Sequence, residues 1–151
     1  FGIFPDGLRL FDAPGEVRQL TLADRQLTDR YPPHRGEHAP SLSRLVEWAE
    51  EHGRSVVFAA IAEGEIVSYV DFGRVVDNLW EMGYMHTREE YRGRGFAKAV
   101  LSHASAYLLE HSILPLYHDS VHNVASIRAA QAVGYREAFR SVSCRGRPRT
   151  S

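Results

Sequence analysis

The segment Tyr91-Arg92-Gly93-Arg94-Gly95-Phe96-Ala97 constrains the fold more than any other stretch of the chain. A strand pattern from Leu79 to Thr87 precedes it, and an amphipathic helix pattern from Ala97 to about Glu110 follows it. Two glycines around a basic residue leave backbone N–H groups unobstructed at the positive end of the helix. This strand–loop–helix arrangement therefore predicts a binding site for a phosphate or a diphosphate.

The composition favours one globular domain around this loop. The chain has 151 residues, of which 44% are hydrophobic and 25% are charged, enough for one core but hardly for two domains. We expect residues 1–144 to form the domain and the basic segment 145–151 to be a flexible, solvated tail. Because the net charge is −1, no surface-wide field favours nucleic acid or an anionic membrane as a partner.

The single cysteine, Cys144, excludes an internal disulfide and makes a reducing, cytoplasmic location the default expectation. No apolar run approaches the ~18 residues that a membrane-spanning helix needs. The first residues also lack the basic and apolar regions of a signal peptide. The chain begins with Phe1 rather than methionine, which leaves open whether residues precede it.

The N-terminal part of the chain predicts two short strands and a short helix. Leu8–Phe11 is a possible edge strand, and Val17–Leu22 alternates apolar and polar residues like a half-buried strand. Thr21 then offers a cap for a helix that ends before Pro32.

A polar loop and a second helix follow. Residues 31–41 contain two histidines and either rim a pocket or form a solvated connection. Ser41 is the predicted N-cap of the helix and Gly53 ends it. The apolar face of this helix consists of Leu42, Leu45, Val46 and Ala49.

Three adjacent antiparallel strands are predicted in the middle of the chain. Ser55–Ala62 and Ile66–Phe72 flank a tight turn, Glu63-Gly64-Glu65, as the strands of a hairpin do. Leu79–Thr87 is the third strand, after a loop over residues 75–78.

The last part of the chain predicts the parallel pair of the sheet. Pro115–His118 is a short buried strand, which a right-handed crossover through the preceding helix places parallel to Leu79–Thr87. Asn123 and Gly134 bound a final helix, and Tyr135–Val142 alternates as a final strand. The apolar positions of this helix are Val124, Ile127 and Val133. The predicted fold is therefore mixed α+β, with a mostly antiparallel sheet of six to seven strands and about four helices.

Other kinds of site fit the sequence poorly. The loop lacks the Gly-x-x-x-x-Gly-Lys-[Ser/Thr] pattern of nucleotide triphosphatases and the three-glycine spacing of dinucleotide-binding folds. His118, Asp119 and His122 lie close in sequence, but their spacing matches no common zinc motif. We expect no metal site.

The loop does match the pattern [Gln/Arg]-x-x-Gly-x-[Gly/Ala], with Arg92, Gly95 and Ala97 at the defined positions. Asn123-x-x-Ser126, followed by Gly134-Tyr135, is a second matching pattern at the expected distance. Together they resemble the GNAT superfamily of acyl-CoA-dependent N-acetyltransferases, over about Leu79 to Phe139.

The resemblance implies roles for the matching positions. The N–H groups from Arg92 through Ala97 would hold the diphosphate of coenzyme A. The strand before the loop would splay from its parallel neighbour, so that backbone groups at about Met85–Thr87 bind the pantetheine arm. Asn123 would contact the cofactor as well as cap its helix, unless it only caps. The implied cofactor-binding residues are Met85, His86, Thr87, Arg92, Gly93, Arg94, Gly95, Phe96, Ala97, Asn123 and Ser126.

Acyl transfer to an amine needs a base, because an alkyl amine with a pKa near ~10.4 is about 99.9% protonated at neutral pH. Glu81, on the strand that leads to the loop, is the first candidate, acting directly or through water. His86 and His118 are the next candidates. The alternatives are an exposed strand residue for Glu81 and a satisfied or surface imidazole for each histidine.

The sequence departs from the family pattern at one catalytic position. Many members have a tyrosine seven residues after the asparagine, where it protonates the departing thiolate, and this chain has Ala130 there. The proton donor is then Tyr135, Tyr117, His118 or water, or no donor is needed because a thiolate is a tolerable leaving group.

The sequence therefore predicts an N-acetyltransferase that moves an acetyl group from acetyl-CoA to a primary amine of a small molecule or peptide, by direct attack in a ternary complex. The alternative is a non-catalytic acyl-CoA-binding sensor or interaction module with the same fold. The loop over residues 31–41 and the aromatic residues Trp48, Tyr69 and Trp80 would select the acceptor. Either a monomer or a homodimer is compatible with exposed strand edges.

Overall fold

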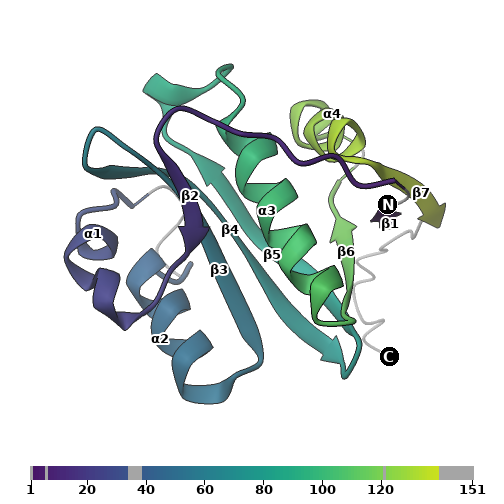
Figure 1. The fold of residues 1–151 in the computed structure, drawn as a ribbon, viewed down its shortest axis with the longest axis horizontal. Helices are drawn as coiled ribbons and strands as arrows, with labels where there is room; N and C mark the ends of the chain where they lie inside the picture. Colours follow the sequence, from purple (N-terminus) through teal and green to yellow (C-terminus); the bar gives the residue numbers. More distant parts are fainter. Residues whose placement is uncertain (1, 6, 34–38, 121, 140–151) are drawn as a thin grey trace, which may run out of the picture.

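A seven-stranded mixed sheet forms the centre of the molecule, with helices on both faces (Figure 1). The computed structural model describes residues 2–5, 7–33, 39–120 and 122–139, and the predictions for Cys144 and for the tail 145–151 fall outside these residues. The strands are β1 (Gly2–Pro5), β2 (Glu16–Gln19), β3 (Ser55–Ala62), β4 (Glu65–Val76), β5 (Leu79–Thr87), β6 (Leu114–His118) and β7 (Tyr135–Phe139). The helices are α1 (Arg25–Asp29), α2 (Leu42–His52), α3 (Phe96–Glu110) and α4 (Val124–Val133), with short 3₁₀ turns at Leu22–Asp24 and Glu89–Tyr91.

The sheet has the mixed, mostly antiparallel topology that the sequence predicts. Its strand order is β2-β3-β4-β5-β6-β1-β7. Strands β2 to β5 are antiparallel neighbours, and β5 and β6 form the parallel pair. The central strands β3 and β4 are buried on both faces, which explains their nearly continuous apolar sequence. The predicted fold class is confirmed.

The predicted edge strand at Leu8–Phe11 is wrong. This segment crosses over α3 on its way from β1 to β2, so it pairs with no strand (Figure 1). Its backbone bonds to helices instead: Arg9 N–H donates to the carbonyl of Val133 at 2.8 Å, and Phe11 N–H donates to the Ser102 hydroxyl at 2.9 Å. The first strand is β1, which lies between β6 and β7.

Other element boundaries agree closely with the sequence. The predicted strand Val17–Leu22 is shifted to Glu16–Gln19, because Thr21 leaves the strand to cap the first 3₁₀ turn in a capping box with Asp24. Ser41 caps α2 through its hydroxyl, and Gly53 ends α2 in the left-handed conformation. At the start of α4, Val124 is exposed rather than part of the apolar face.

Each face of the sheet packs against its own hydrophobic core. On the α3 face, helices α3 and α4 pack over the sheet through Phe72, Val100, Leu101, Leu108 and Val133. On the α2 face, α2 packs over β3 and β4 through Leu45, Val46, Val57, Ile66 and Tyr69. Each fully buried side chain of this kind stabilises the fold by about 1.5–3 kcal/mol. The two faces are therefore independent layers, and residues of β5 point alternately into each.

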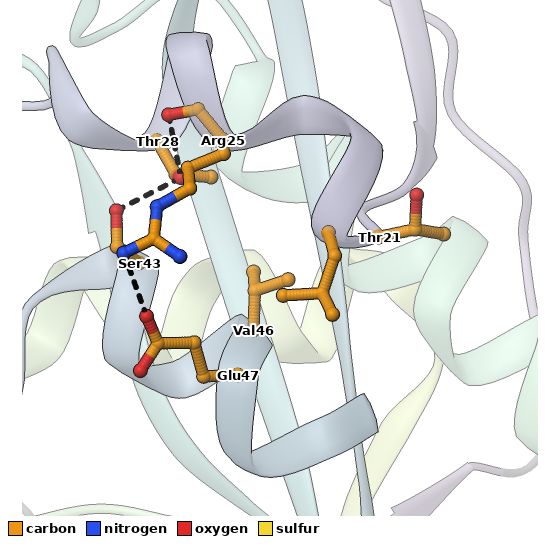
Figure 2. A pocket seen from close by; sticks show the side chains of 7 residues that line it. Thr21, Arg25, Thr28, Ser43, Val46 and Glu47 are labelled. Atoms are coloured by element: carbon orange, nitrogen blue, oxygen red, sulfur yellow. Dashed lines mark hydrogen bonds and ion pairs between the residues drawn. The ribbon is translucent and has the colours of Figure 1, made fainter. Parts of the chain in front are cut away.

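A small polar junction joins α1 to α2 (Figure 2). The Ser43 hydroxyl lies 2.9 Å from the Thr28 hydroxyl, and the Arg25 guanidinium pairs with Glu47 at 3.2 Å. The cavity between these side chains is about 10 Å³. Because that is roughly the space of one water molecule, the junction is a packing contact rather than a ligand site.

Replacing Asp24 with asparagine should lower the free energy of unfolding by about 1–3 kcal/mol at neutral pH. The buried carboxylate accepts two bonds from the Arg18 guanidinium, at 2.9 and 2.6 Å. The Arg18 hydrogen bond lowers the pKa of Asp24 below its ordinary value of 3.8, and burial opposes this only in part. The stabilisation should thus be complete above about pH 5 and disappear as the pH falls through the folded-state pKa.

Urea unfolding of wild type and D24N at several pH values measures this difference. The substitution D12N is the control, because the side chain of Asp12 is 93% exposed and should contribute less than about 0.5 kcal/mol. A difference between wild type and D24N that stays constant down to pH 2 would contradict the prediction.

Candidate functional site

The loop between β5 and α3 presents unpaired backbone N–H groups. Gly93 and Gly95 have φ angles of 76° and 85°, which side-chain-bearing residues rarely adopt. Within the described residues, the N–H groups of residues 93–98 have no hydrogen-bond acceptor in the protein. They lie at the N-terminus of the 15-residue helix α3, where the helix dipole is positive. The loop is therefore built to bind an anion.

A groove of about 430 Å³ runs from this loop to the start of α4. The end of β5, the loop, the first turn of α3 and the first two turns of α4 form its walls. Its lining consists of Met85, His86, Thr87, Tyr91, Arg92, Gly93, Gly95, Phe96, Ala97, Lys98, Asn123, Ala125, Ser126 and Ala129. The basic side chains of Arg92 and Lys98 add positive charge at the anion-binding end.

The parallel strands β5 and β6 separate next to this groove. They pair only from Leu79–Glu81 on β5 to Leu114–Leu116 on β6, and the rest of β5 has no pairing with β6 among the described residues. The six residues from Met82 to Thr87 span about 17 Å at ~3.3 Å per residue. The result is a wedge whose closed end lies at Glu81 and Leu116, and whose open end lies at the glycine loop.

All residues that the sequence predicts to bind the cofactor line this groove except Arg94. The guanidinium of Arg94 instead lies over the ring of Tyr91, 5.4 Å from its centre. Sequence reasoning missed Tyr91, Lys98, Ala125 and Ala129. Ala129 lies three residues after Ser126 on the same helix face, and Ala125 lies one turn before Ala129, so helical spacing could have indicated both.

The expected cap at Asn123 is wrong in its side-chain part. Asn123 occupies the N-cap position of α4, but its side chain makes no capping hydrogen bond. Its amide nitrogen donates to the Asp119 carboxylate at 2.9 Å. The Asn123 side chain is therefore held at the rim of the groove by Asp119 rather than by the helix.

Glu81 and His118 come together at the closed end of the wedge. Trp80 and Met82 both pack on the α3 face, so Glu81 between them points to the α2 face. By the same alternation His118, next to Tyr117, points to the α2 face. The Glu81 carboxylate lies 3.6 Å from His118 Nδ1, and both side chains are about two-fifths exposed. This pair can take up a proton from a molecule that approaches from the α2 face.

His86 belongs to a different cluster from Glu81 and His118. Its Nδ1 lies 2.6 Å from the Tyr31 hydroxyl, and the Tyr31 ring meets the Tyr69 ring edge to face at 5.2 Å. The Arg88 guanidinium covers the Tyr31 ring at 5.1 Å. Burial raises the pKa of Tyr31, so its phenol stays protonated. His86 is thus held in a packed aromatic cluster on the α2 face, although it also borders the groove.

Only one of the three aromatic residues expected to shape an acceptor site lies in this cluster. Tyr69 does, and it is buried. Trp80 packs on the α3 face, because it is next to Glu81 on β5 and successive side chains of a strand point to opposite faces. Trp48 is 39% exposed on α2, with the Arg44 guanidinium over its ring at 5.1 Å.

Sequence reasoning also missed Asp71, a buried carboxylate on β4. It accepts a hydrogen bond from Tyr84 N–H at 2.6 Å, at an irregularity in the β4–β5 pairing. A Cβ atom on Gly83 would lie 2.9 Å from the Asp71 carboxylate. Gly83 and Asp71 therefore fix a bulge in β5, which reorients its side chains before the groove begins.

The tyrosines that remained as proton donors differ in their surroundings. The Tyr135 hydroxyl bonds to the Ser105 hydroxyl at 2.6 Å, inside the core between α3 and β7. The Tyr117 hydroxyl bonds to the hydroxyl of Ser126, which lines the groove. Ala130 is completely buried one helical turn after Ser126.

Among the described residues, no three histidine, cysteine, aspartate or glutamate side chains converge as metal ligands. In the same part of the chain, no helix combines the length and the hydrophobicity needed to cross a bilayer.

Comparison with family models finds one match. A sequence model described as the acetyltransferase (GNAT) family matches residues 21–135. This range contains the glycine loop, the wedge and α4. A search of curated proteins finds no match.

Solved structures share the fold at low sequence identity. An acetyltransferase of the GNAT family from Novosphingobium aromaticivorans has a TM-score of 0.66 and 22% identity, over 91% of this chain and 58% of the other. The aminoglycoside N-acetyltransferase AAC(6')-Iy, in complex with a coenzyme A bisubstrate analogue, has a TM-score of 0.65 and 18% identity, over 87% and 97%. A ribosomal-protein-alanine N-acetyltransferase from Brucella melitensis has a TM-score of 0.61 and 16% identity, over 87% and 98%.

Proposed function

The chain belongs to the GNAT family of acetyltransferases, and from this premise we propose that it transfers an acetyl group from acetyl-CoA to a primary amine. The reaction is a direct attack of the amine on the thioester while both substrates are bound. The observation that carries the proposal is the glycine loop with its unpaired N–H groups, at the open end of a wedge between two parallel strands.

The groove suits coenzyme A in shape and in charge. The N–H groups of residues 93–98 and the start of α3 would bind the diphosphate, and the Cβ positions of Gly93 and Gly95 point into open space. The stretch of β5 from Met82 to Thr87, which lies beyond the pairing with β6, would bind the pantetheine arm through its backbone groups. Asn123 and Ser126 would contact the arm from the opposite wall. The thioester would then lie near the closed end of the wedge.

The amine would approach from the α2 face, opposite the groove. There Glu81 would remove its proton, directly or through water, and His118 at 3.6 Å would share the charge. His86 would contribute by fixing the wall of the site through Tyr31 rather than as the base. Since AAC(6')-Iy was solved with a bisubstrate analogue of an aminoglycoside amine, a small amine is a sensible first acceptor to test.

Acetyl-CoA should raise the melting temperature of the protein by about 5–10 °C at 100 times its Kd, since such binding adds about 2.7 kcal/mol of stability. Free thiol should also be released when an amine is added. The measurement is thermal unfolding with and without acetyl-CoA, followed by thiol detection across a panel of aminoglycosides, polyamines, amino acids and peptides.

The outcome separates the enzyme from the binding-only alternative. Stabilisation by acetyl-CoA without thiol release for any amine would favour a sensor. Failure of millimolar coenzyme A to change the melting temperature would refute the assignment of the groove.

A further inference from the structure

The closed end of the wedge contains a pair of hydroxyl groups, of which the family pattern includes Ser126 as a cofactor contact but does not include Tyr117. Leu116 is the last residue of β6 that pairs with β5, so Tyr117 is the first residue beyond the closed end. Its side chain points to the α3 face and is completely buried. Its hydroxyl bonds to the Ser126 hydroxyl on the first turn of α4, and Ser126 borders the groove. A chain of two hydroxyls thus connects the core to the groove at this point.

A tyrosine at position 130 would extend toward the helical turn that carries Ser126. Side chains of an α-helix tilt toward its N-terminus, so a long side chain at position 130 would cover the turn that contains Ser126. Ala130 leaves that space to its neighbours, and Tyr117 belongs to the same buried cluster as Ala130. In this chain the phenol comes from the strand next to the helix instead of from the helix itself.

We propose that the Ser126 hydroxyl donates a hydrogen bond to the sulfur that leaves the thioester, and that Tyr117 is the positioning residue that turns this hydroxyl toward the groove. The inference rests on the proposed function, because it takes the thioester to lie at the closed end of the wedge.

The proposed roles of Tyr117 and Ser126 depend on which of the two hydroxyl groups donates to the other. Burial, together with the nearby Asp119 carboxylate, raises the pKa of Tyr117, so the phenol remains protonated. Either hydroxyl can donate in the Tyr117–Ser126 bond, and the proposed arrangement is the one in which the phenol donates to Ser126 Oγ. With that lone pair engaged, the hydrogen of Ser126 is free to point into the groove. When the amine attacks, the C–N bond forms, the C–S bond breaks, and the electron pair stays on sulfur. Glu81 or water takes the proton of the amine, the Ser126 hydrogen bond stabilises the thiolate, and solvent protonates the thiolate as it departs.

The test compares S126A, Y117F and the double variant with wild type. S126A should lower kcat by about 10- to 100-fold, the usual effect of losing one hydrogen bond to a charged group, with KM for acetyl-CoA changed by less than about three-fold. Y117F should lower kcat by about five- to ten-fold, because it only releases the serine. The double variant should be no slower than S126A, because both residues act on the same hydrogen bond.

A second readout does not depend on turnover. The pKa of the thiol of bound coenzyme A, followed by the ultraviolet absorbance of the thiolate, should be about one unit higher in S126A than in wild type. S126T keeps a hydroxyl and should restore kcat, and the acid dissociation constant of the thiol, to within about three-fold of wild type. The matched control is S105A, which breaks a similar serine–tyrosine bond at 2.6 Å away from the groove. It should lower the melting temperature and leave kcat and the thiol pKa unchanged.

An unchanged thiol pKa in S126A would overturn the inference, as would losses of kcat that multiply in the double variant. The thiol measurement requires binding alone. A shifted thiol pKa in a protein that acetylates no amine would therefore support the sulfur contact while contradicting the proposed transfer. If coenzyme A does not bind the wild type, both the proposed function and this inference fail.

Discussion

Replacing Gly95 with valine should weaken coenzyme A binding by at least about 100-fold, which corresponds to about 2.7 kcal/mol. Gly95 has a φ of 85° and immediately precedes α3. A β-branched residue is strongly disfavoured at this φ, so the loop would have to change conformation. The N–H groups of residues 93–98 would then no longer point to one place. Losing two of these bonds to a diphosphate is enough for the expected effect, since each contributes about 1.5–3 kcal/mol.

Gly53 offers a matched control for this substitution. It has a φ of 60°, ends α2, and like Gly95 has no atom within 4 Å of its Cβ position. G53V should therefore cause a similar loss of stability, about 1–3 kcal/mol, without changing the dissociation constant. Calorimetric titration of both variants with coenzyme A, at a temperature where both are folded, provides the comparison. Equal affinities of G95V and G53V for coenzyme A would show that the glycine loop is not part of the binding site.

Replacing Glu81 with glutamine should lower kcat by about 100- to 10,000-fold, the range for loss of a general base. Glutamine keeps the size of the side chain and cannot accept the proton. Coenzyme A affinity should stay within about two-fold of wild type, because Glu81 points to the α2 face and does not line the groove. The deficit should shrink as the pH rises toward ~10.4, where solvent itself deprotonates an alkyl amine.

The rate of thiol release over a range of pH, with a fixed amine and saturating acetyl-CoA, measures this effect. E16Q is the control, since Glu16 lies in β2 of the same sheet and its side chain is 61% exposed. Wild-type kcat in E81Q would show that His118 or water is the base. H118N would then separate these two by its own effect on kcat.

Local sequence patterns predicted most of the fold because local interactions determine those elements. The cap at Ser41, the left-handed Gly53 and the turn between β3 and β4 depend on residues within one or two turns of the chain. The edge strand at Leu8–Phe11 failed for the opposite reason. Its backbone partners, Ser102 and Val133, lie far away in the sequence, and nothing local indicates that the segment crosses a helix.

Local sequence likewise predicts some features of the candidate site and not others. The positive φ angles of Gly93 and Gly95 and the start of α3 are local features, so the anion-binding loop could be found from residue types and spacing. The pairing of Glu81 with His118 could not be found that way, because it depends on the register of β5 against β6. The bulge that Asp71 holds in β5 is also a contact between strands.

The sequence by itself determined that the chain has a glycine loop between a strand and a helix, a mixed sheet with one parallel pair, and a family resemblance that rests on two short motifs. Only the tertiary structure decided where β5 and β6 separate, that the Asn123 side chain bonds to Asp119 rather than capping α4, and that Tyr117 reaches Ser126 beside the small Ala130. The physical reason is the range of the interactions. Backbone conformation and capping depend on neighbours in the chain, whereas strand register and side-chain hydrogen bonds depend on which elements pack together.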